Sequence, residues 1–328
     1  MSAPILSVRD LKVHFPIPAG GMLRRRYVPL KAVDGVSFDL GPGETLDIVG
    51  ESGCGKSTLG RAVLQLIPPT AGQVIWLGEN LAGRDAGAMR RHRRELQIIF
   101  QDPLASLDPR MPIGQIIAEP LVTHEPSLAR AEVRQRVQQM MRAVGLLPQM
   151  INRYPHEFSG GQCQRIGIAR AMILRPRLIV CDEPVSALDV SIQAQIVNLL
   201  MSLQREFGLS LLFISHNLAV VRHICHRIMV LYLGRMCEIA DRDALYTEPR
   251  HPYTQALISA VPIPDPELER SRRRIILSGD LPSPLKPPSG CVFRTRCPRA
   301  TAICADVAPV VESVAAAHEV ACHHWRQS

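Results

Sequence analysis

The sequence is poor in aromatic residues and has no long apolar run. Phe, Trp and Tyr make up 4% of its 328 residues, which leaves few side chains for stacking nucleic-acid bases. No run approaches the ~18 uncharged apolar residues of a membrane-spanning helix. The N-terminus, Met1-Ser2-Ala3-Pro4, also lacks the charged and apolar regions of a signal peptide. We therefore expect the chain to remain in the cytoplasm.

The formal net charge is +8, yet the basic residues stand in separate clusters. The clusters are Arg24–Arg26, Arg90–Arg94 and Arg272–Arg274, and no aromatic residue is interleaved with them. We interpret each as a solvated face, with attraction to anionic lipid as the weaker alternative. At this length the chain exceeds one typical domain and can bury a large core.

A glycine-rich segment at residues 50–58, GESGCGKST, carries the strongest chemical signal. It matches G-x-x-x-x-G-K-[ST] and lies between the apolar Ile48-Val49 and a run of apolar residues with helical spacing. This strand–loop–helix setting is the one that a P-loop requires, and its backbone N–H groups bind β- and γ-phosphates. Lys56 is predicted to neutralise phosphate charge and Ser57 to ligate magnesium. The predicted nucleotide-binding residues here are Gly50, Ser52, Gly53, Cys54, Gly55, Lys56, Ser57 and Thr58.

Two carboxylates follow another short apolar run. Residues 177–183 read RLIVCDE, the pattern of a buried parallel strand that delivers acids to the carboxyl edge of a sheet. We predict that Asp182 holds magnesium and that Glu183 polarises the attacking water. Strand–helix alternation resumes from residue 166 to about 233, which indicates an α/β fold.

The segment Ser159-Gly160-Gly161-Gln162 narrows the class of P-loop protein that the sequence resembles. It opens a helix, and its two glycines let the backbone approach an anion closely. With the P-loop and Asp182-Glu183, it resembles the signature of the ABC-type ATPases over residues 1 to about 240. The resemblance implies a P-loop NTPase core that binds ATP and Mg²⁺. It also implies a head-to-tail dimer, in which Ser159, Gly160, Gly161 and Gln162 contact the γ-phosphate held by the opposite subunit.

Further positions match other ABC motifs. Gln101 matches the Q-loop glutamine, residues 186–189 (SALD) match the D-loop, and His216 matches the switch histidine near the γ-phosphate. The resemblance implies that the catalytic residues are Glu183, His216, Gln101 and Lys56. It implies magnesium contacts from Ser57, Gln101 and Asp182.

Two residues depart from the family pattern. Asp47 lies in the strand that enters the P-loop, where relatives usually have a small or apolar residue. A carboxylate buried there costs several kcal/mol unless it is paired, so we expect an arginine partner or a weakened affinity for triphosphate. Asn217 stands where an aspartate is usual, and we expect a mild effect.

Alternating apolar residues over 6–15 and 36–40 predict an antiparallel β flank, with an exposed excursion at residues 16–30. Phe15 resembles in position the adenine-stacking aromatic of the family, with Tyr27 as the alternative. Residues from 102 to about 165 break the alternation and predict a helical subdomain, which in ABC ATPases docks the membrane subunits. We divide the chain into an ABC ATPase domain, 1–240, and a C-terminal extension, 241–328.

The extension is rich in proline, which predicts a unit wrapped by loops rather than a second sheet. Its segment His251-Pro252-Tyr253 resembles the ATPases of oligopeptide and dipeptide importers, specifically the second ATPase of such a pair. The resemblance implies ATP-driven peptide import at the cytoplasmic face of the membrane. The implied partners are a non-identical ATPase, two permeases and an extracytoplasmic substrate-binding protein. A nickel chelate or glutathione is the alternative cargo, and an ABC ATPase acting on nucleic acid or ribosomes is the rival class.

Four of the nine cysteines gather in the extension: Cys291, Cys297, Cys304 and Cys322. Their spacing differs from the tight C-x-x-C pairs of most zinc sites, and a reducing cytoplasm disfavours disulfides. Four thiolates suit an iron–sulfur cluster. Some importer ATPases of this family carry a [4Fe–4S] cluster on four such cysteines, so the resemblance favours that cofactor in a structural role. The alternatives are zinc, with help from His318, His323 or His324, and no metal.

Overall fold

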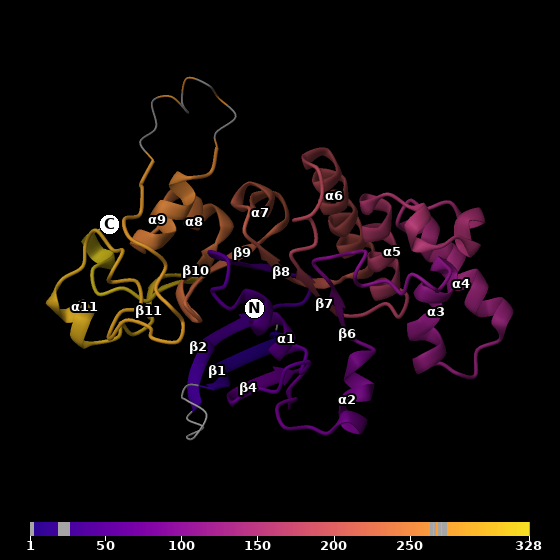
Figure 1. Cartoon of the computed structure of the whole chain (residues 1–328), viewed down its shortest axis with the longest axis horizontal. Helices are drawn as coiled ribbons and strands as arrows, with labels where there is room; N and C mark the ends of the chain where they lie inside the picture. Colours follow the sequence, from indigo (N-terminus) through magenta and orange to yellow (C-terminus); the bar gives the residue numbers. More distant parts are fainter. Residues whose placement is uncertain are drawn as a thin grey trace.

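The computed structural model describes residues 3–18, 27–262, 265, 267, 270 and 274–327. A mixed sheet with strand order β11-β12-β10-β9-β3-β8-β7-β6 crosses the middle of the molecule, and a sheet with order β2-β1-β4-β5 flanks it (Figure 1). The strands are β1 Leu6–Pro18, β2 Tyr27–Leu40, β3 Thr45–Val49, β4 Ala71–Trp76, β5 Glu79–Asn80, β6 Leu96–Ile99, β7 Leu178–Asp182, β8 Ser210–Ser215, β9 Arg227–Tyr232, β10 Arg235–Asp241, β11 Glu312–Ala315 and β12 His318–Val320.

The centre of the large sheet is parallel and buried on both faces. Strands β3, β7 and β8 pair in parallel, and every residue in them is buried. Burial on both faces explains why these strands are near-continuous apolar runs instead of alternating ones. The helices are α1 Lys56–Val63, α2 Ala86–Arg93, α3 Ile113–His124, α4 Arg130–Ala143, α5 Gly160–Met172, α6 Val190–Phe207, α7 Leu218–Ile224, α8 Arg242–Thr247, α9 Pro252–Ser259 and α11 Ala302–Asp306.

The antiparallel flank is present, but it is longer than the sequence indicated. Strands β1 and β2 pair as far as Pro18↔Tyr27, so residues 16–18 and 27–30 are strand rather than loop. The prolines at 16, 18 and 29 are compatible with this because the ends of a hairpin do not need every ladder hydrogen bond. Residues 19–26, including the basic cluster Arg24–Arg26, lie outside the described part of the chain.

Helices α3, α4 and α5 form a lobe at the end of the molecule opposite the C-terminal extension (Figure 1). The expected apolar stripe of α4 is buried at Val137, Met140 and Met141. Gly145 follows the helix with a φ of 75°, which a glycine adopts without a Cβ penalty. This lobe corresponds to the predicted helical subdomain, although its limits and the division at residue 240 stay predictions.

The C-terminal extension joins the large sheet itself. Strand β12 pairs antiparallel with β10, and β11 pairs with β12, so the extension lengthens the sheet that holds β3. Around this attachment, the rings of Tyr232, Tyr253 and Phe293 pack edge-on or tilted with centroids 4.8–5.2 Å apart. The described part of the extension is therefore mostly loops, as expected, but it is tied to the core by sheet hydrogen bonds and an aromatic cluster.

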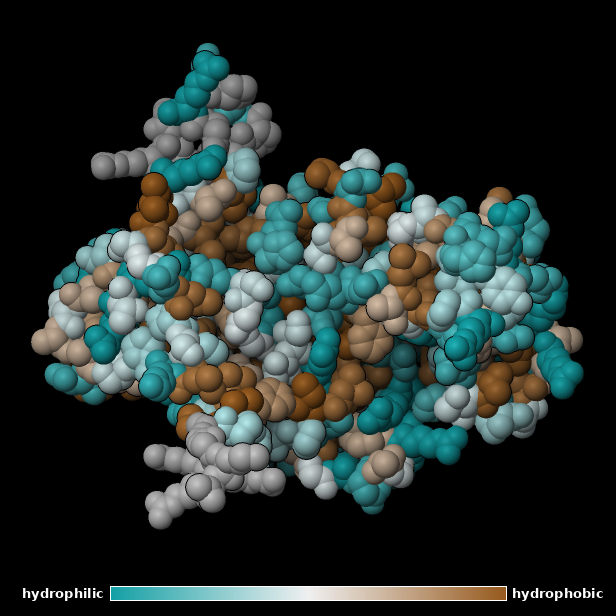
Figure 2. All heavy atoms as spheres, viewed as in Figure 1, coloured by the Kyte–Doolittle hydropathy of each residue, from teal (hydrophilic) through white to brown (hydrophobic). Residues whose placement is uncertain are grey.

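On the face drawn in Figure 2, hydrophilic and hydrophobic side chains are interspersed over the helical lobe and the extension. Within the described ranges, no helix combines the length and the apolar character that crossing a bilayer requires. In the cluster Arg90–Arg94 the four arginines are exposed, as expected of a solvated face. Of the cluster Arg272–Arg274, only Arg274 belongs to the described residues.

The expectation of an arginine partner for Asp47 is wrong. Asp47 is 0% exposed, and neither of its carboxyl oxygens has a hydrogen-bond partner among the described residues. Burial raises the pKa of this carboxyl well above its usual value, more than the Lys56 ammonium lowers it. The raised pKa favours the protonated, neutral form of Asp47, which carries no charge that would repel a triphosphate.

We expect Asp47→Asn to change the pH dependence of stability. The unfolded chain releases the Asp47 proton above pH ~3.9 whereas the fold keeps it, so the native protein loses stability as pH rises toward the raised pKa. Asparagine does not ionise, so between pH ~3.9 and the raised pKa the variant should gain up to about 1.4 kcal/mol of unfolding free energy per pH unit relative to the native protein. Urea unfolding between about pH 5 and pH 7.5 measures this slope. The exposed Asp280→Asn is the control, and a pH-independent difference for Asp47→Asn would mean that the buried group is ionised.

Candidate nucleotide-binding site

The P-loop connects β3 to α1 and is held by close backbone packing. Gly50 has a φ of 153°, and a Cβ there would lie 2.2 Å from the carbonyl oxygen of Leu231. Gly55, at the start of α1, has a φ of 105°, and a Cβ there would lie 2.0 Å from the carbonyl oxygen of Ala32. Only glycine fits at these positions, which explains two of the fixed glycines of the motif.

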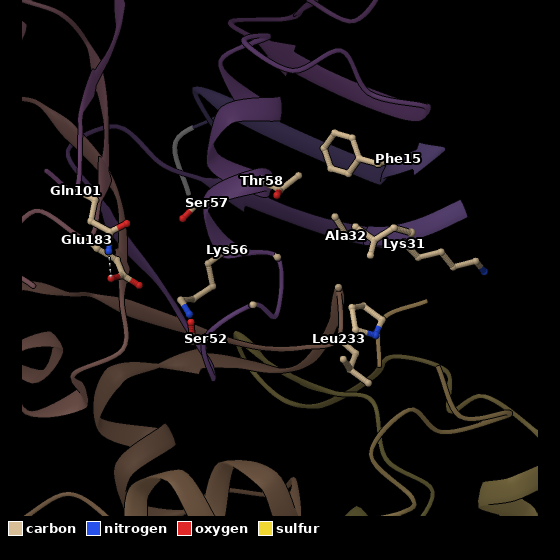
Figure 3. A pocket seen from close by; sticks show the side chains of 15 residues that line it. Phe15, Lys31, Ala32, Ser52, Lys56, Ser57, Thr58, Gln101, Glu183 and Leu233 are labelled. Carbon is tan, nitrogen blue, oxygen red and sulfur yellow. Dashed lines mark hydrogen bonds between the residues drawn. The ribbon is translucent and has the colours of Figure 1, made fainter. Parts of the chain in front are cut away.

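A cavity of about 300 Å³ opens beside the loop (Figure 3). Of the residues predicted from sequence, those that line it are Phe15, Ser52, Gly53, Gly55, Lys56, Ser57, Thr58, Gln101 and Glu183. Gly50 and Cys54 are not among the lining residues, and the Cys54 side chain is buried in the core beneath the loop. The ammonium of Lys56 donates to the carbonyl oxygens of Gly50 (2.8 Å) and Glu51 (3.1 Å). A cationic group and a loop rich in backbone N–H groups make this cavity suited to a polyphosphate.

Strand β7 ends at Asp182, whose side chain contacts Ser57 at the start of α1. The hydroxyl of Ser57 donates to Asp182 Oδ1 at 2.6 Å, and Arg61 Nη2 lies 3.3 Å from Asp182 Oδ2. A hydroxyl and a carboxylate in contact at a phosphate site are the oxygen ligands that Mg²⁺ takes alongside substrate phosphates. These side chains therefore fit the predicted magnesium site.

Glu183 is the point at which the predicted catalytic groups meet. Its Oε2 accepts from Gln101 Nε2 at 3.1 Å and lies 3.3 Å from His216 Nδ1. Glu183 has a φ of 47°, which is unusual for a residue with a side chain and costs of order 1–3 kcal/mol. Its backbone N–H donates to the carbonyl oxygen of Ile214 at 3.0 Å, which holds the residue in this conformation. Chain segments distant in sequence thus converge on one carboxylate at the cavity edge.

The signature segment, residues 159–162, does not line this cavity. Ser159 caps α5 and forms a capping box with Gln162, so the helix N-terminus is well formed. None of Ser159, Gly160, Gly161 and Gln162 lines the cavity of its own chain. A single chain therefore brings the P-loop, the acids and the switch histidine together, and leaves the signature outside.

Sequence reasoning missed several lining residues. Leu30, Lys31 and Ala32 from β2, Leu233 and Gly234 from the β9–β10 turn, and Pro284 from the extension complete the cavity wall. Phe15 projects into this part of the cavity (Figure 3), whereas Tyr27 is 55% exposed and does not line it. In the sequence, only the turn dipeptide Leu233-Gly234 pointed to any of these lining residues. The contacts made by β2 and by the extension depend on tertiary packing and leave no local pattern.

Asn217 substitutes for the expected aspartate without losing the cap of α7. Its side-chain oxygen accepts from the backbone N–H groups of Ala219 (3.0 Å) and Val220 (3.4 Å). Asparagine and aspartate are about equally good N-caps, so the helix that follows His216 is retained.

The four cysteines of the extension share one neighbourhood as free thiols. The backbone N–H of Cys291 donates to the carbonyl oxygen of Cys304 at 2.8 Å. Burial, with a smaller contribution from the neighbouring cysteines, raises the pKa of Cys291 and Cys297, and that of Cys322 to about 11. Even so, the described residues contain no group of three or more His, Cys, Asp or Glu side chains close enough together to hold a metal ion.

The histidines offered as zinc ligands have other partners. His318 Nε2 lies 2.8 Å from Glu238, His324 Nε2 lies 2.8 Å from the Thr301 hydroxyl, and His323 Nε2 lies 3.0 Å from the Val307 carbonyl oxygen. These contacts engage one ring nitrogen of each histidine and leave Nδ1 as the candidate zinc ligand.

Comparison with known proteins agrees with this geometry. The family model described as "ABC transporter" matches residues 33–186, and that described as "Oligopeptide/dipeptide transporter, C-terminal region" matches residues 237–304. The oligopeptide transport ATP-binding protein OppF of Salmonella typhimurium is 61% identical over 97% of this chain and 95% of its own length. The oligopeptide transport ATP-binding protein AppF of Bacillus subtilis is 53% identical over 97% of each chain.

Solved structures match the fold. An ATP-binding cassette in a dimeric post-hydrolysis state, bound to ADP and Pi, aligns with a TM-score of 0.64 and 26% identity, covering 72% of this chain and 98% of that one. A component of an ABC transporter complex from Clostridium perfringens aligns with a TM-score of 0.64 and 24% identity, covering 75% of this chain and 92% of that one. The second likeness concerns the fold alone.

The fold and the cavity define a P-loop NTPase of the ABC class, an ATPase. Within that class, the chain belongs to the family of ABC transporter ATP-binding proteins that includes the oligopeptide transport relatives above.

We expect Gly55→Ala to destabilise the protein much more than Gly53→Ala. Both glycines have positive φ, so each substitution strains the backbone by about 1 kcal/mol. A Cβ at Gly53 meets nothing within 4 Å, whereas one at Gly55 would overlap the Ala32 carbonyl oxygen. Urea unfolding without nucleotide should show an additional loss of about 2 kcal/mol or more for Gly55→Ala. Equal losses in the two variants would contradict the packing described here.

Proposed function

We propose that this chain is the ATP-hydrolysing subunit that energises import of peptides of the oligopeptide class across the cytoplasmic membrane. The observation that carries the proposal is the convergence of Gln101 and His216 on Glu183, beside a P-loop cavity. The cargo class is supported by the relatives, which are named oligopeptide transport ATP-binding proteins at 53–61% identity. The family model that matches the C-terminal region is described as that of an oligopeptide/dipeptide transporter.

In the proposed mechanism, Lys56 turns from the Gly50 and Glu51 carbonyl oxygens toward the β- and γ-phosphates. Ser57, Asp182 and Gln101 would hold Mg²⁺, which when bound neutralises phosphate charge. Glu183 holds the attacking water in line with the γ-phosphate, and His216 and Gln101 keep the carboxylate and the water oriented. Phe15 stacks on adenine. Most of the rate enhancement then comes from positioning and charge stabilisation.

The partner assignments rest on the placement of the signature segment. Because Ser159 and the residues after it do not line the cavity of their own chain, we propose that they complete the site of a second, non-identical ATPase. ATP that binds the closed pair better than the open pair can then drive two permease subunits between states. We place the chain at the cytoplasmic face of the membrane, bound through those permeases and supplied by an extracytoplasmic binding protein.

Glu183→Gln tests this assignment. The amide can still accept a hydrogen bond from Gln101 but cannot act as a carboxylate, so we expect ATP to bind while turnover falls by at least ~10²-fold. The ATP-loaded variant should also elute as a stable dimer with its partner ATPase in size-exclusion chromatography. Glu206→Gln, an exposed change at the end of α6, is the matched control. Undiminished hydrolysis in Glu183→Gln would reject the catalytic role.

We propose in addition that Cys291, Cys297, Cys304 and Cys322 ligate a [4Fe–4S] cluster with a structural role. The four thiols are neighbours within the extension. A [4Fe–4S] cluster takes four thiolate ligands, which is the number of cysteines gathered there.

Anaerobic purification of the full chain tests the cluster. We expect iron and acid-labile sulfide in equal amounts, with Cys322→Ser losing both and unfolding at a lower temperature. Cys225→Ser, a buried cysteine outside the extension, should keep them. Zinc without sulfide, or no metal at all, would reject the cluster while leaving the ATPase assignment untouched.

A further inference from the structure

The C-terminal extension contacts the P-loop at Glu51, the second residue of the GESGCGKST segment. Arg296 Nη1 lies 2.7 Å from Glu51 Oε2, and the Arg296 side chain is only 10% exposed. On its other side, the backbone N–H of Glu51 donates to the Tyr253 hydroxyl at 2.9 Å. Both the side chain and the backbone of Glu51 are thus bonded to residues that lie 202 and 245 positions further along the chain.

Contacts with neighbouring residues position the Tyr253 hydroxyl. His251 caps α9, because its ring Nδ1 accepts a hydrogen bond from the backbone N–H of Tyr253 at 3.0 Å. The backbone N–H of His251 donates to Oε2 of the buried Glu238 at 2.9 Å. Burial lowers the pKa of His251 to about 4, so the ring is neutral and its nitrogen can accept. The Tyr253 ring is 0% exposed and packs against Tyr232 and Phe293. The segment His251-Pro252-Tyr253 therefore places the Tyr253 hydroxyl against the P-loop.

Arg296 is similarly constrained. It lies three residues after Phe293, whose buried ring belongs to the same aromatic cluster, and its guanidinium lies beside the Tyr232 hydroxyl. A largely buried ion pair constrains geometry more than an exposed one, because removing one partner leaves the other charge without compensation.

Glu51 in turn controls the geometry of the phosphate site. Its carbonyl oxygen accepts from the Lys56 ammonium at 3.1 Å and from the Cys54 backbone N–H at 3.3 Å. Its own backbone N–H is engaged by Tyr253, and Ser52, the next residue, lines the cavity. A rotation at Glu51 would therefore displace the turn that presents the phosphate-binding N–H groups.

We propose that Arg296 and Tyr253 are positioning residues for the nucleotide site, which hold the P-loop in its phosphate-binding shape through Glu51. Affinity for ATP then depends on the C-terminal extension, although neither residue contacts the nucleotide. The proposal rests on the ATP-binding function proposed above and adds a role for the extension in it.

The test uses the full chain assembled with its transport partners and measures KM and kcat for ATP, together with binding of a fluorescent ATP analogue. Arg296→Ala should raise KM and weaken analogue binding by roughly tenfold, the effect of losing one charged hydrogen bond, while kcat stays within about twofold. Tyr253→Phe, which keeps the ring and removes only the hydroxyl, should shift KM in the same direction by about threefold. Arg296→Lys should recover part of the loss.

Arg294→Ala is the matched control, because this neighbouring arginine bonds to Ser289 within the extension. Its KM should equal that of the native chain. Combining Arg296→Ala with Glu51→Gln should add little to either single change, because both remove the same contact.

Unchanged KM in Arg296→Ala and Tyr253→Phe, or additive effects in the double variant, would overturn the inference. A lowered unfolding temperature with native KM would also overturn it, since that result indicates a merely structural role. If Arg296→Ala does not fold, Arg296→Lys and Tyr253→Phe still decide the question. Failure of the native chain to bind ATP would instead refute the proposed function.

Discussion

The close backbone packing around the P-loop is the constraint on which the rest of the structure depends. The loop is wedged between β2 and the β9–β10 turn, and the Gly234 N–H donates to the Cys54 carbonyl oxygen at 2.8 Å while the Asp34 N–H donates to the Gly234 carbonyl oxygen at 2.8 Å. The flanking sheet, the central sheet and the extension all meet on this loop. Its N–H groups can therefore point at an anion without rearranging, which is what makes such a site effective.

The site also retains features that work against stability. Asp47 is a buried carboxyl without a hydrogen-bond partner among the described residues, in the strand that enters the P-loop, and Glu183 holds a backbone conformation that costs free energy. The hydrogen bonds that surround Glu183 and the apolar core on both faces of β3 and β7 offset these costs. Residues held by the fold against their local preference are typical of functional sites.

Much of this arrangement was predictable because its determinants are local. The P-loop, the apolar strand before Asp182-Glu183, and the capped helix after Ser159 each combine a short motif with a periodicity that sequence alone displays. What sequence could not provide was contact between distant segments. The lining by Lys31 and Pro284, the strand β12 added beside β10, and the bonds from Tyr253 and Arg296 to Glu51 arise from tertiary packing with no local signature. The unpaired state of Asp47 was missed for the same reason, since the pattern of a strand does not say which charges its neighbours carry.

The attachment of β12 to β10 has an evolutionary consequence. A domain linked only by a flexible tether can be exchanged between proteins, and its sequence is free to drift independently of its host. Here the tail completes a sheet that begins several strands earlier at β3, and it shares an aromatic cluster with β9. Substitutions in the tail and in the core must therefore remain mutually compatible. We therefore expect such a tail to be inherited together with its ATPase instead of being acquired as an independent cassette.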